Sequence, residues 1–184
     1  MRHIISIRDL DRAEIDGILD HAQALQGQEY NSQALKGKLL GLLFFEPSTR
    51  TRMSFASAIA RLGGQSISMD SVEASSMVKG ETLADTIRVV SGYVDAIVLR
   101  HPKEGAARLA SEFAQVPVIN AGDGAGQHPS QTLLDLYTIR QSMPLEGVTV
   151  GLLGDLRYGR TAHSLAHALS LYRATLHTIS PKGL

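Results

Sequence analysis

Short apolar runs alternate with amphipathic segments along most of the chain, and this alternation is the clearest signal in the sequence. Residues 9–25 place apolar side chains at helical spacing behind Asp9, which we expect to cap that helix. Farther along, apolar runs with the length of buried strands alternate with segments of helical periodicity. The predicted strands are 39–45, 65–69, 94–99, 116–119, 147–153 and 174–179, and the remaining predicted helices are 52–62, 81–91, 104–114, 130–142 and 161–172.

Strands that alternate with helices of this length indicate an α/β fold with a parallel sheet flanked by helices. The first four strands suffice for one compact sheet, which ends near residue 140. The segment 141–147 then interrupts the pattern, and a new βαβ unit begins at Val148. Because two strands and one helix cannot bury a core alone, we expect one domain at 1–143 and the start of a second, incomplete domain at 144–184.

The charge balance narrows the classes of ligand. The chain has 184 residues, with 18 Lys+Arg against 18 Asp+Glu, which argues against a nucleic-acid coat or a polybasic membrane-surface protein. Of the basic residues 13 are Arg, the side chain that best forms bidentate contacts with phosphate and carboxylate. The absence of cysteine excludes disulfides and thiolate chemistry and favours a cytoplasmic location. The apolar runs are too short to span a bilayer.

Ligands of open parallel sheets bind beyond the carboxyl ends of the strands, so the segments that follow the strands carry the candidate chemistry. After the first strand, Ser48, Thr49, Arg50 and Thr51 stand at the start of a helix, followed by Arg52. Helix N–H groups, hydroxyls and a guanidinium together form a sensible anion site. An ordinary capped helix with solvated arginines explains the same residues equally well.

The later strand ends add further candidates. Arg100 directly follows the third strand, where it either reaches the same crevice or pairs with a nearby acid at the rim. The segment 120–131 has three glycines within five residues, which permit a close backbone approach to a ligand. In that segment His128 is suited to polarising a carbonyl or moving a proton, and Gln131 to binding an amide.

Two other features carry little chemistry by themselves. The polar loop 71–80 has the composition of a solvated surface loop. The segment 151–161 runs from strand through glycines to helix, but its spacing fits neither a dinucleotide site nor a Walker loop. His163 and His167 lie four residues apart, but no acid completes a zinc motif, so we interpret them as core or rim histidines.

Taken together, five ordered motifs resemble the catalytic chains of aspartate carbamoyltransferases, in the aspartate/ornithine carbamoyltransferase family. The motifs lie at 44–52, 79–86, 99–102, 128–138 and 154–161. The Ser-Thr-Arg-Thr-Arg element is common to carbamoyltransferases. The Arg-His-Pro and Gly-Asp-Leu-Arg-Tyr-Gly-Arg-Thr elements indicate the aspartate branch.

The resemblance implies transfer of the carbamoyl group from carbamoyl phosphate to the amine of L-aspartate, an early step of pyrimidine biosynthesis. It implies a carbamoyl-phosphate-binding domain at 1–143 and the start of an aspartate-binding domain at 144–184, with neither cofactor nor metal. By resemblance, the residues that hold the phosphate are Ser48, Thr49, Arg50, Thr51 and Arg100. The catalytic residues Thr51, Arg100 and His128 bind the carbonyl oxygen, and Gln131 binds the carbamoyl amine. Lys79 and Arg160 bind aspartate.

The resemblance also bears on assembly. Ser75 and Lys79 match a loop that reaches the active site of a neighbouring subunit, which implies a homotrimer with shared sites. Many family members also bind regulatory chains, and the sequence leaves such chains open here. The chemistry of the reaction agrees with these roles: Arg50, Arg100, Arg160 and Lys79 supply cations for two anionic substrates, and preplaced donors stabilise the developing oxyanion.

Two departures from the family pattern leave alternatives open. Ala56 stands where the family usually has Glu, one turn beyond the phosphate arginines, which we expect to loosen their positioning. In the family, an Arg-x-Gln element and a Pro-Leu loop beyond the position of Leu184 complete the aspartate pocket, and the sequence does not include them. An ornithine-type carbamoyltransferase and a catalytically inactive anion-binding or assembly module therefore remain as alternatives.

Overall fold

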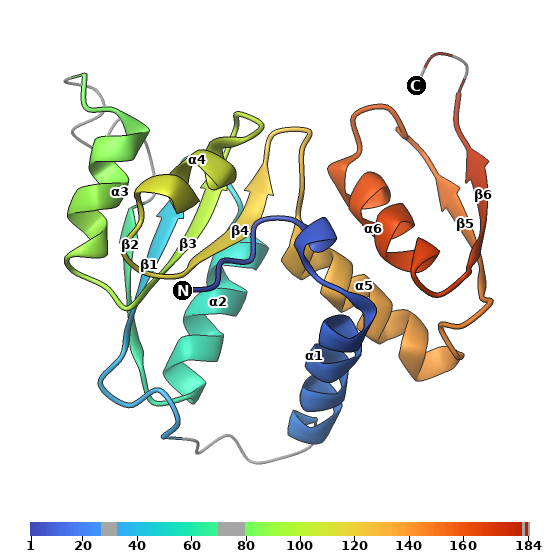
Figure 1. Ribbon diagram of the computed structural model, residues 1–184, viewed down its shortest axis with the longest axis horizontal. Coiled ribbons are helices and arrows are strands. Elements are labelled where there is room, and N and C mark those ends of the chain that lie inside the picture. The colour runs from blue at the N-terminus through green and yellow to red at the C-terminus, as the bar shows by residue number, and fades with distance from the viewer. Residues whose placement is uncertain (27–32, 70–79, 182, 184) are drawn as a thin grey trace. The chain divides into compact units, whose positions relative to one another are not determined.

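The computed structural model describes residues 1–26, 33–69, 80–181 and 183, and it confirms the α/β class (Figure 1). The helices are the 3₁₀ helix η1 (Ile7–Asp9) and the α-helices α1 (Arg12–Leu25), α2 (Thr49–Arg61), α3 (Leu83–Ser91), α4 (Ala106–Phe113), α5 (Pro129–Ser142) and α6 (Arg160–Ser170). The strands are β1 (Leu39–Phe44), β2 (Gln65–Met69), β3 (Ala96–His101), β4 (Val118–Asp123), β5 (Thr149–Leu153) and β6 (Thr175–Ile179). They form one parallel sheet of order β2-β1-β3-β4 and a separate parallel pair β5-β6, as the break at 141–147 predicts.

Contacts divide the chain into two compact units. Unit 1 comprises Met1–Ile5 and Glu29–Gly124, and unit 2 comprises Ser6–Gln28 and Ala125–Leu184. This division differs from the predicted boundary at 143/144, because it groups α5 with α1 and α6. The reason is that Leu136 of α5 is fully buried in one cluster with side chains from α1 and α6.

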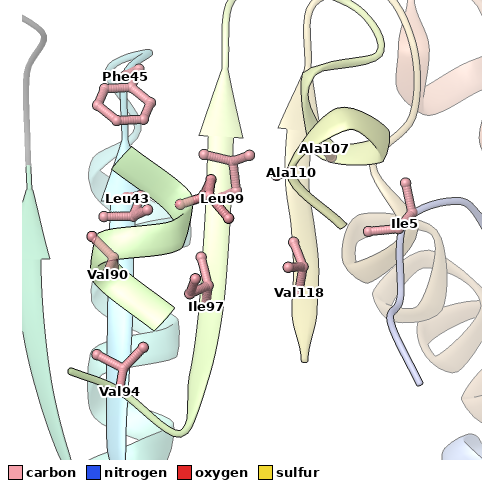
Figure 2. Close-up of a cluster of buried hydrophobic side chains, with 11 residues drawn as sticks. Ile5, Leu43, Phe45, Val90, Val94, Ile97, Leu99, Ala107, Ala110 and Val118 are labelled. Carbon is pink, nitrogen blue, oxygen red and sulfur yellow. The ribbon is translucent and has the colours of Figure 1, made fainter. Parts of the chain in front are cut away.

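Strands β1, β3 and β4 of the unit 1 sheet are buried on both faces, whereas the edge strand β2 is partly exposed. Alternate residues of β1 point to opposite sides, so that Leu43 joins one apolar cluster and Leu42 another. Helices α3 and α4 cover the first face, where Figure 2 shows Val90, Ala107 and Ala110 in the cluster, and Ile87 of α3 also belongs to it. Helix α2 covers the other face through Ile59. This two-sided burial explains why β1 and β3 are continuous apolar runs rather than alternating ones.

Unit 2 has its own core. Its buried members come from η1, α1, α5, α6 and the segments beside β5, and they are Ile7, Leu10, Ile15, Leu19, Leu136, Leu145, Val148, Leu165, Ala168, Leu169 and Tyr172. The β5-β6 pair packs one face towards this cluster through Val150, Leu152 and Leu176. The opposite face stays open, with Leu153 79% exposed.

The structure shifts several predicted boundaries for identifiable reasons. The first long helix begins at Arg12, not near Asp9, because Asp11 and Glu14 form a capping box there while Asp9 closes η1 against Ser6. Strands β3 and β4 run on to His101 and Asp123, past the end of the apolar pattern. Their polar ends stay in the sheet because His101 pairs with Asp123 across it.

Candidate functional site

The carboxyl ends of β1 and β3 bring the first candidate residues to one edge of unit 1. Phe44 is in register with Arg100, and the Phe45 N–H donates to the Arg100 carbonyl at 2.9 Å. Because α2 follows β1 after four residues, its first turn begins at the same edge of the sheet. The sequence prediction that Ser48–Thr51 and Arg100 belong to one edge is therefore consistent with the strand register.

The Arg100 guanidinium is held from two directions. Its side chain is only 10% exposed, Nη1 donates to the Ala121 carbonyl at 3.0 Å, and Nη2 forms an ion pair with Glu46. These contacts fix the guanidinium at the strand end, where it is suited to binding an anion. The sequence analysis left open that Arg100 pairs with a nearby acid, and the structure identifies that acid as Glu46.

The first turn of α2 presents unused backbone donors. Ser48 is the N-cap residue, but no side chain among the described residues caps this end, and Arg52 makes the first backbone hydrogen bond, to the Ser48 carbonyl. The N–H groups of Thr49, Arg50 and Thr51 therefore point out of the helix end. Thr49 and Arg50 are exposed, and Ser48 and Thr51 are half-buried. This arrangement suits a phosphate-sized anion.

Ala56 lies one to two turns farther along the same helix. It is half-buried and packs against the apolar cluster beneath α2. The residue that departs from the family pattern is thus a small packing contact with that core. The predicted loosening of the phosphate arginines remains an expectation.

The segment after β4 is locked to the segment after β3. The Asp123 carboxylate accepts from the Gly105 N–H and the Asn120 amide, each at 3.0 Å, and the Gly124 N–H donates to the His101 carbonyl at 2.9 Å. Gly124 has φ +53°, and a Cβ there would lie 2.8 Å from the Pro102 oxygen. The close backbone approach of this glycine is therefore made to the protein's own chain.

His101 is a buried histidine to which the sequence analysis gave no role beyond its place in the Arg-His-Pro element. Its Nδ1 accepts from the Lys103 N–H at 3.0 Å, and its ring packs edge-on against Phe45. Burial, with the nearby Lys103 charge, lowers the His101 pKa, against the smaller opposing influence of Asp123 and Glu46. The imidazole is thus held neutral as an acceptor beside Arg100.

In unit 2, His128 is the buried N-cap residue of α5. Its N–H donates to the Ser164 hydroxyl at 3.4 Å, and that hydroxyl donates to Gln127 Oε1 at 3.2 Å. Ser6 donates to the same oxygen at 3.0 Å, while the Ser130 hydroxyl lies 3.3 Å from His128 Nδ1. Ser164 and Ser6 are supporting residues that sequence reasoning missed, because they lie far from His128 in the chain.

Gln131 follows His128 in the first turn of α5. Its backbone N–H donates to the His128 carbonyl at 3.1 Å, and its side-chain Nε2 donates to Asp135 Oδ1 at 2.9 Å. Burial raises the Asp135 pKa, and the hydrogen bond from Gln131 partly offsets this. His128 and Gln131 are thus brought to one helix end, as the sequence predicts.

Arg160 is the first residue of α6, at the end of a tightly built turn. Asp155 Oδ1 accepts from the Arg157 and Tyr158 N–H groups at 3.0 and 2.9 Å. A Cβ on Gly159 would lie 2.3 Å from the backbone carbonyl oxygen of Asp155, so only glycine fits there. This turn, which follows β5, therefore fixes the position of the Arg160 backbone at the start of α6.

Two of the predicted site residues, Ser75 and Lys79, lie outside the described residues. Across the described ranges, no group of three or more His, Asp or Glu side chains is arranged to hold a metal ion. Over those same ranges, every helix is too short or too polar to cross a membrane.

Comparison with known proteins identifies the family. Residues 2–141 match the family model described as aspartate/ornithine carbamoyltransferase, carbamoyl-P binding domain. The aspartate carbamoyltransferase catalytic subunits of Methanoculleus marisnigri and Methanosphaerula palustris are 79% and 72% identical over the whole chain, which spans 62% of each. The catalytic subunit of M. jannaschii aspartate transcarbamoylase superposes with a TM-score of 0.92 at 55% identity, over all of this chain and 62% of that one. A Trypanosoma cruzi aspartate transcarbamoylase in complex with aspartate and phosphate gives 0.91 at 42% identity, over all of this chain and 60% of that one.

The matched family model covers three-quarters of the residues and includes the Ser48–Thr51 turn, Arg100, His128 and Gln131. The chain belongs to the aspartate/ornithine carbamoyltransferase family.

Proposed function

We propose that this protein transfers the carbamoyl group of carbamoyl phosphate to L-aspartate, giving N-carbamoyl-L-aspartate and phosphate in the cytoplasm, early in pyrimidine biosynthesis. The observation that carries the proposal is the shared edge of unit 1, where the uncapped α2 terminus and the anchored Arg100 follow paired strands. The relatives named above are aspartate carbamoyltransferases, which favours aspartate over ornithine as the acceptor. Because the chain spans 62% of those relatives, the complete activity is part of the proposal.

The α2 terminus is assigned the phosphate. Ser48, Thr49 and Thr51 supply hydroxyls, the first-turn N–H groups supply donors along the helix dipole, and Arg50 supplies a charge. Arg100 assists from the end of β3. Its ion pair with Glu46 means that the arginine is oriented before ligand arrives and must share or exchange that partner when a dianion binds.

The carbonyl oxygen is assigned to Thr51, Arg100 and His128, and the carbamoyl amine to Gln131. As the aspartate amine attacks, negative charge develops on the carbonyl oxygen, and fixed donors lower the barrier to that step. The bond to the phosphate oxygen then breaks, and the attacking nitrogen loses a proton. His128 is suited to its part because Ser164 and Ser130 both contact it, which restricts its backbone and ring.

The aspartate side is assigned to Arg160 and Lys79, with Lys79 and Ser75 supplied by a neighbouring subunit of a homotrimer. The tight turn that precedes α6 supports the assignment of Arg160, since it fixes the start of that helix. We keep the chemical division of the chain at 143/144, with carbamoyl-phosphate binding before it and the start of aspartate binding after it. The family match, which ends at residue 141, supports that boundary.

An apolar surface in unit 1 supports assembly with further copies. A cavity of about 210 Å³ opens between the edge strand β2 and α3, and its lining includes Ile67, Met69, Val89 and Tyr93. Ile67, Val89 and Tyr93 are 44%, 52% and 66% exposed. An exposed apolar cluster on a sheet edge is typical of a surface that another chain covers.

Arg50→Ala tests the phosphate assignment by calorimetric titration with carbamoyl phosphate. Loss of one charge-assisted contact to a dianion is expected to weaken binding by about 10- to 150-fold. Arg61→Ala, at the exposed last turn of the same helix, is the matched control and is expected to keep wild-type affinity. Equal affinities for wild type and Arg50→Ala would refute the α2 site, and carbamoylation of ornithine but not aspartate would overturn the choice of acceptor.

A further inference from the structure

The side-chain bond between Gln131 and Asp135 has no assigned part in the proposed reaction. Both residues are half-buried, they stand four positions apart on α5, and Gln131 Nε2 donates to Asp135 Oδ1 at 2.9 Å. Residues at this spacing lie on the same face of a helix. The Gln131 backbone is also tied to the His128 carbonyl, so the glutamine is held at both ends.

The chemistry of the partner decides which way the glutamine amide faces. A glutamine side chain has a donor and an acceptor of nearly the same shape, and its two orientations offer opposite hydrogen-bonding patterns to a ligand. An ionised carboxylate only accepts. Asp135 therefore holds Nε2, which leaves Oε1 as the group that Gln131 offers on its other side.

An acceptor at that position distinguishes a carbamoyl group from other acyl groups. The carbamoyl nitrogen is a hydrogen-bond donor, whereas the methyl group of an acetyl phosphate has nearly the same size and donates nothing. An acceptor that is buried by a ligand and left without a donor costs free energy. The site therefore disfavours the methyl group of an acetyl ligand as well as favouring the amine of a carbamoyl ligand.

We propose that Asp135 is a positioning residue that fixes the Gln131 amide with its oxygen towards the ligand, and so makes the site selective for an acyl phosphate that carries an N–H donor. This inference rests on the proposed function, because it concerns the amine end of the same ligand. A purely structural role for the pair, as a surface bond that supports the helix, changes the affinity of all ligands alike. The two roles therefore differ in one measurable ratio.

The ratio is the affinity for phosphonoacetamide over the affinity for acetonylphosphonate. Both compounds are stable and carry a phosphonate and a carbonyl, and they differ only in an amine against a methyl group. Calorimetric titration of the wild-type protein is expected to show preference for the amide. Asp135→Asn, which lets the glutamine amide turn, and Asp135→Ala are expected to lower that ratio by about three- to tenfold through the amide alone.

Two further variants separate positioning from damage to the helix. Thr138→Ala removes an exposed hydroxyl that bonds the Leu134 carbonyl on the same helix, and it is expected to leave the ratio unchanged. In a Gln131→Ala background, adding Asp135→Asn is expected to leave the ratio at the value of the single variant, because Asp135 acts through Gln131. Circular dichroism confirms that each variant is folded.

The outcomes are distinct. An equal loss of affinity for both ligands in the Asp135 variants, or a further change of the ratio in the Gln131→Ala background, overturns the positioning role. A wild-type protein that binds both ligands without preference overturns it while leaving the phosphate site intact. A folded wild-type protein that binds neither compound overturns the proposed function and this inference with it.

Discussion

At the scale of single residues, the end of β3 combines a charge with a neutral acceptor. Arg100 is fixed by Glu46 and the Ala121 carbonyl, while the next residue, His101, uses its ring nitrogen to hold the Lys103 N–H. A protonated imidazole would lose that acceptor and place a second cation beside Arg100 and Lys103. Burial of the ring is the largest cause of the lowered His101 pKa, and the Lys103 charge lowers this pKa further.

This lowered pKa predicts an acid-sensitive fold. Below the ordinary histidine pKa of about 6.5, the unfolded chain binds a proton that folded His101 resists, so stability falls as the pH decreases towards the lower folded pKa. Above about pH 7 the contribution is complete. Denaturant unfolding between pH 7.5 and 5.5 is expected to show this decline, and His101→Asn, which keeps an acceptor without the titration, is expected to make it shallower.

A second histidine contributes to the same decline in stability. His3 accepts from the Val118 N–H, and burial lowers its pKa as well. His3→Asn is therefore expected to lower the slope by the part that His3 contributes, and the double variant is expected to show the smallest slope. A slope in His101→Asn equal to that of the wild type would show that His101 resists no proton in the fold.

At the scale of elements, the strand ends are where sequence and structure differ most. The apolar pattern predicts the strand interiors well, because burial on both faces selects continuous runs of Leu, Ile and Val. It misses the polar ends His101 and Asp123, because those residues stay in the sheet through pairing and hydrogen bonds that no periodicity records. The proposed anion site lies beside these strand ends, so the polar residues that blur the strand boundaries are neighbours of the candidate site.

The glycine-rich segment at the end of β4 makes a close backbone approach, as predicted, but to the protein's own chain and not to a ligand. Three glycines in five residues indicate a close backbone approach, and Gly124 makes one to residues 102–104 of the same unit. That contact holds together the loops that follow β3 and β4. It thereby supports Arg100 indirectly, without touching a ligand itself.

Gly124→Ala tests this contact at the scale of the loop pair. The new Cβ would lie 2.7 Å from the Glu104 nitrogen in a backbone with φ +53°, so both a clash and a strained conformation are expected. Denaturant unfolding is expected to show a loss of about 2–4 kcal/mol. Gly105→Ala has φ +81° but open space around the new Cβ, and it is expected to cost about 1–2 kcal/mol. Equal losses would mean that the loop contact contributes nothing.

At the scale of the whole molecule, the predictable part of the site is the part written in contiguous motifs. The Ser48–Thr51 turn and the His128–Gln131 turn were each identified from adjacent residues and their place after a strand. The sequence did not identify Glu46 as the acid that pairs with Arg100, nor Ser164 and Ser6 as supports near His128. These contacts exist only after folding brings separate segments together. Helix α5 likewise joins the core of unit 2 through Leu136, a grouping that spacing along the chain does not reveal.

Assembly is the largest-scale claim, and a mixing experiment tests it. If Lys79 acts in the active site of a neighbouring subunit and His128 in its own, Lys79→Ala and His128→Ala are each inactive alone. When the two variants are co-expressed, random pairing places an intact Lys79 beside an intact His128 at about a quarter of the sites of a cyclic trimer. Formation of carbamoyl aspartate by the purified mixture is therefore expected at about a quarter of the wild-type rate per subunit.

Arg50→Ala mixed with His128→Ala is the matched control for this experiment. The proposed function assigns both residues to the site of one subunit, so every site in that mixture lacks one of them and activity stays at the level of the single variants. Recovery in the first mixture alone requires a site built from two subunits. Recovery in both mixtures would mean that Arg50 and His128 of one active site come from different subunits. Recovery in neither mixture would mean that Lys79 and His128 of one active site come from the same subunit.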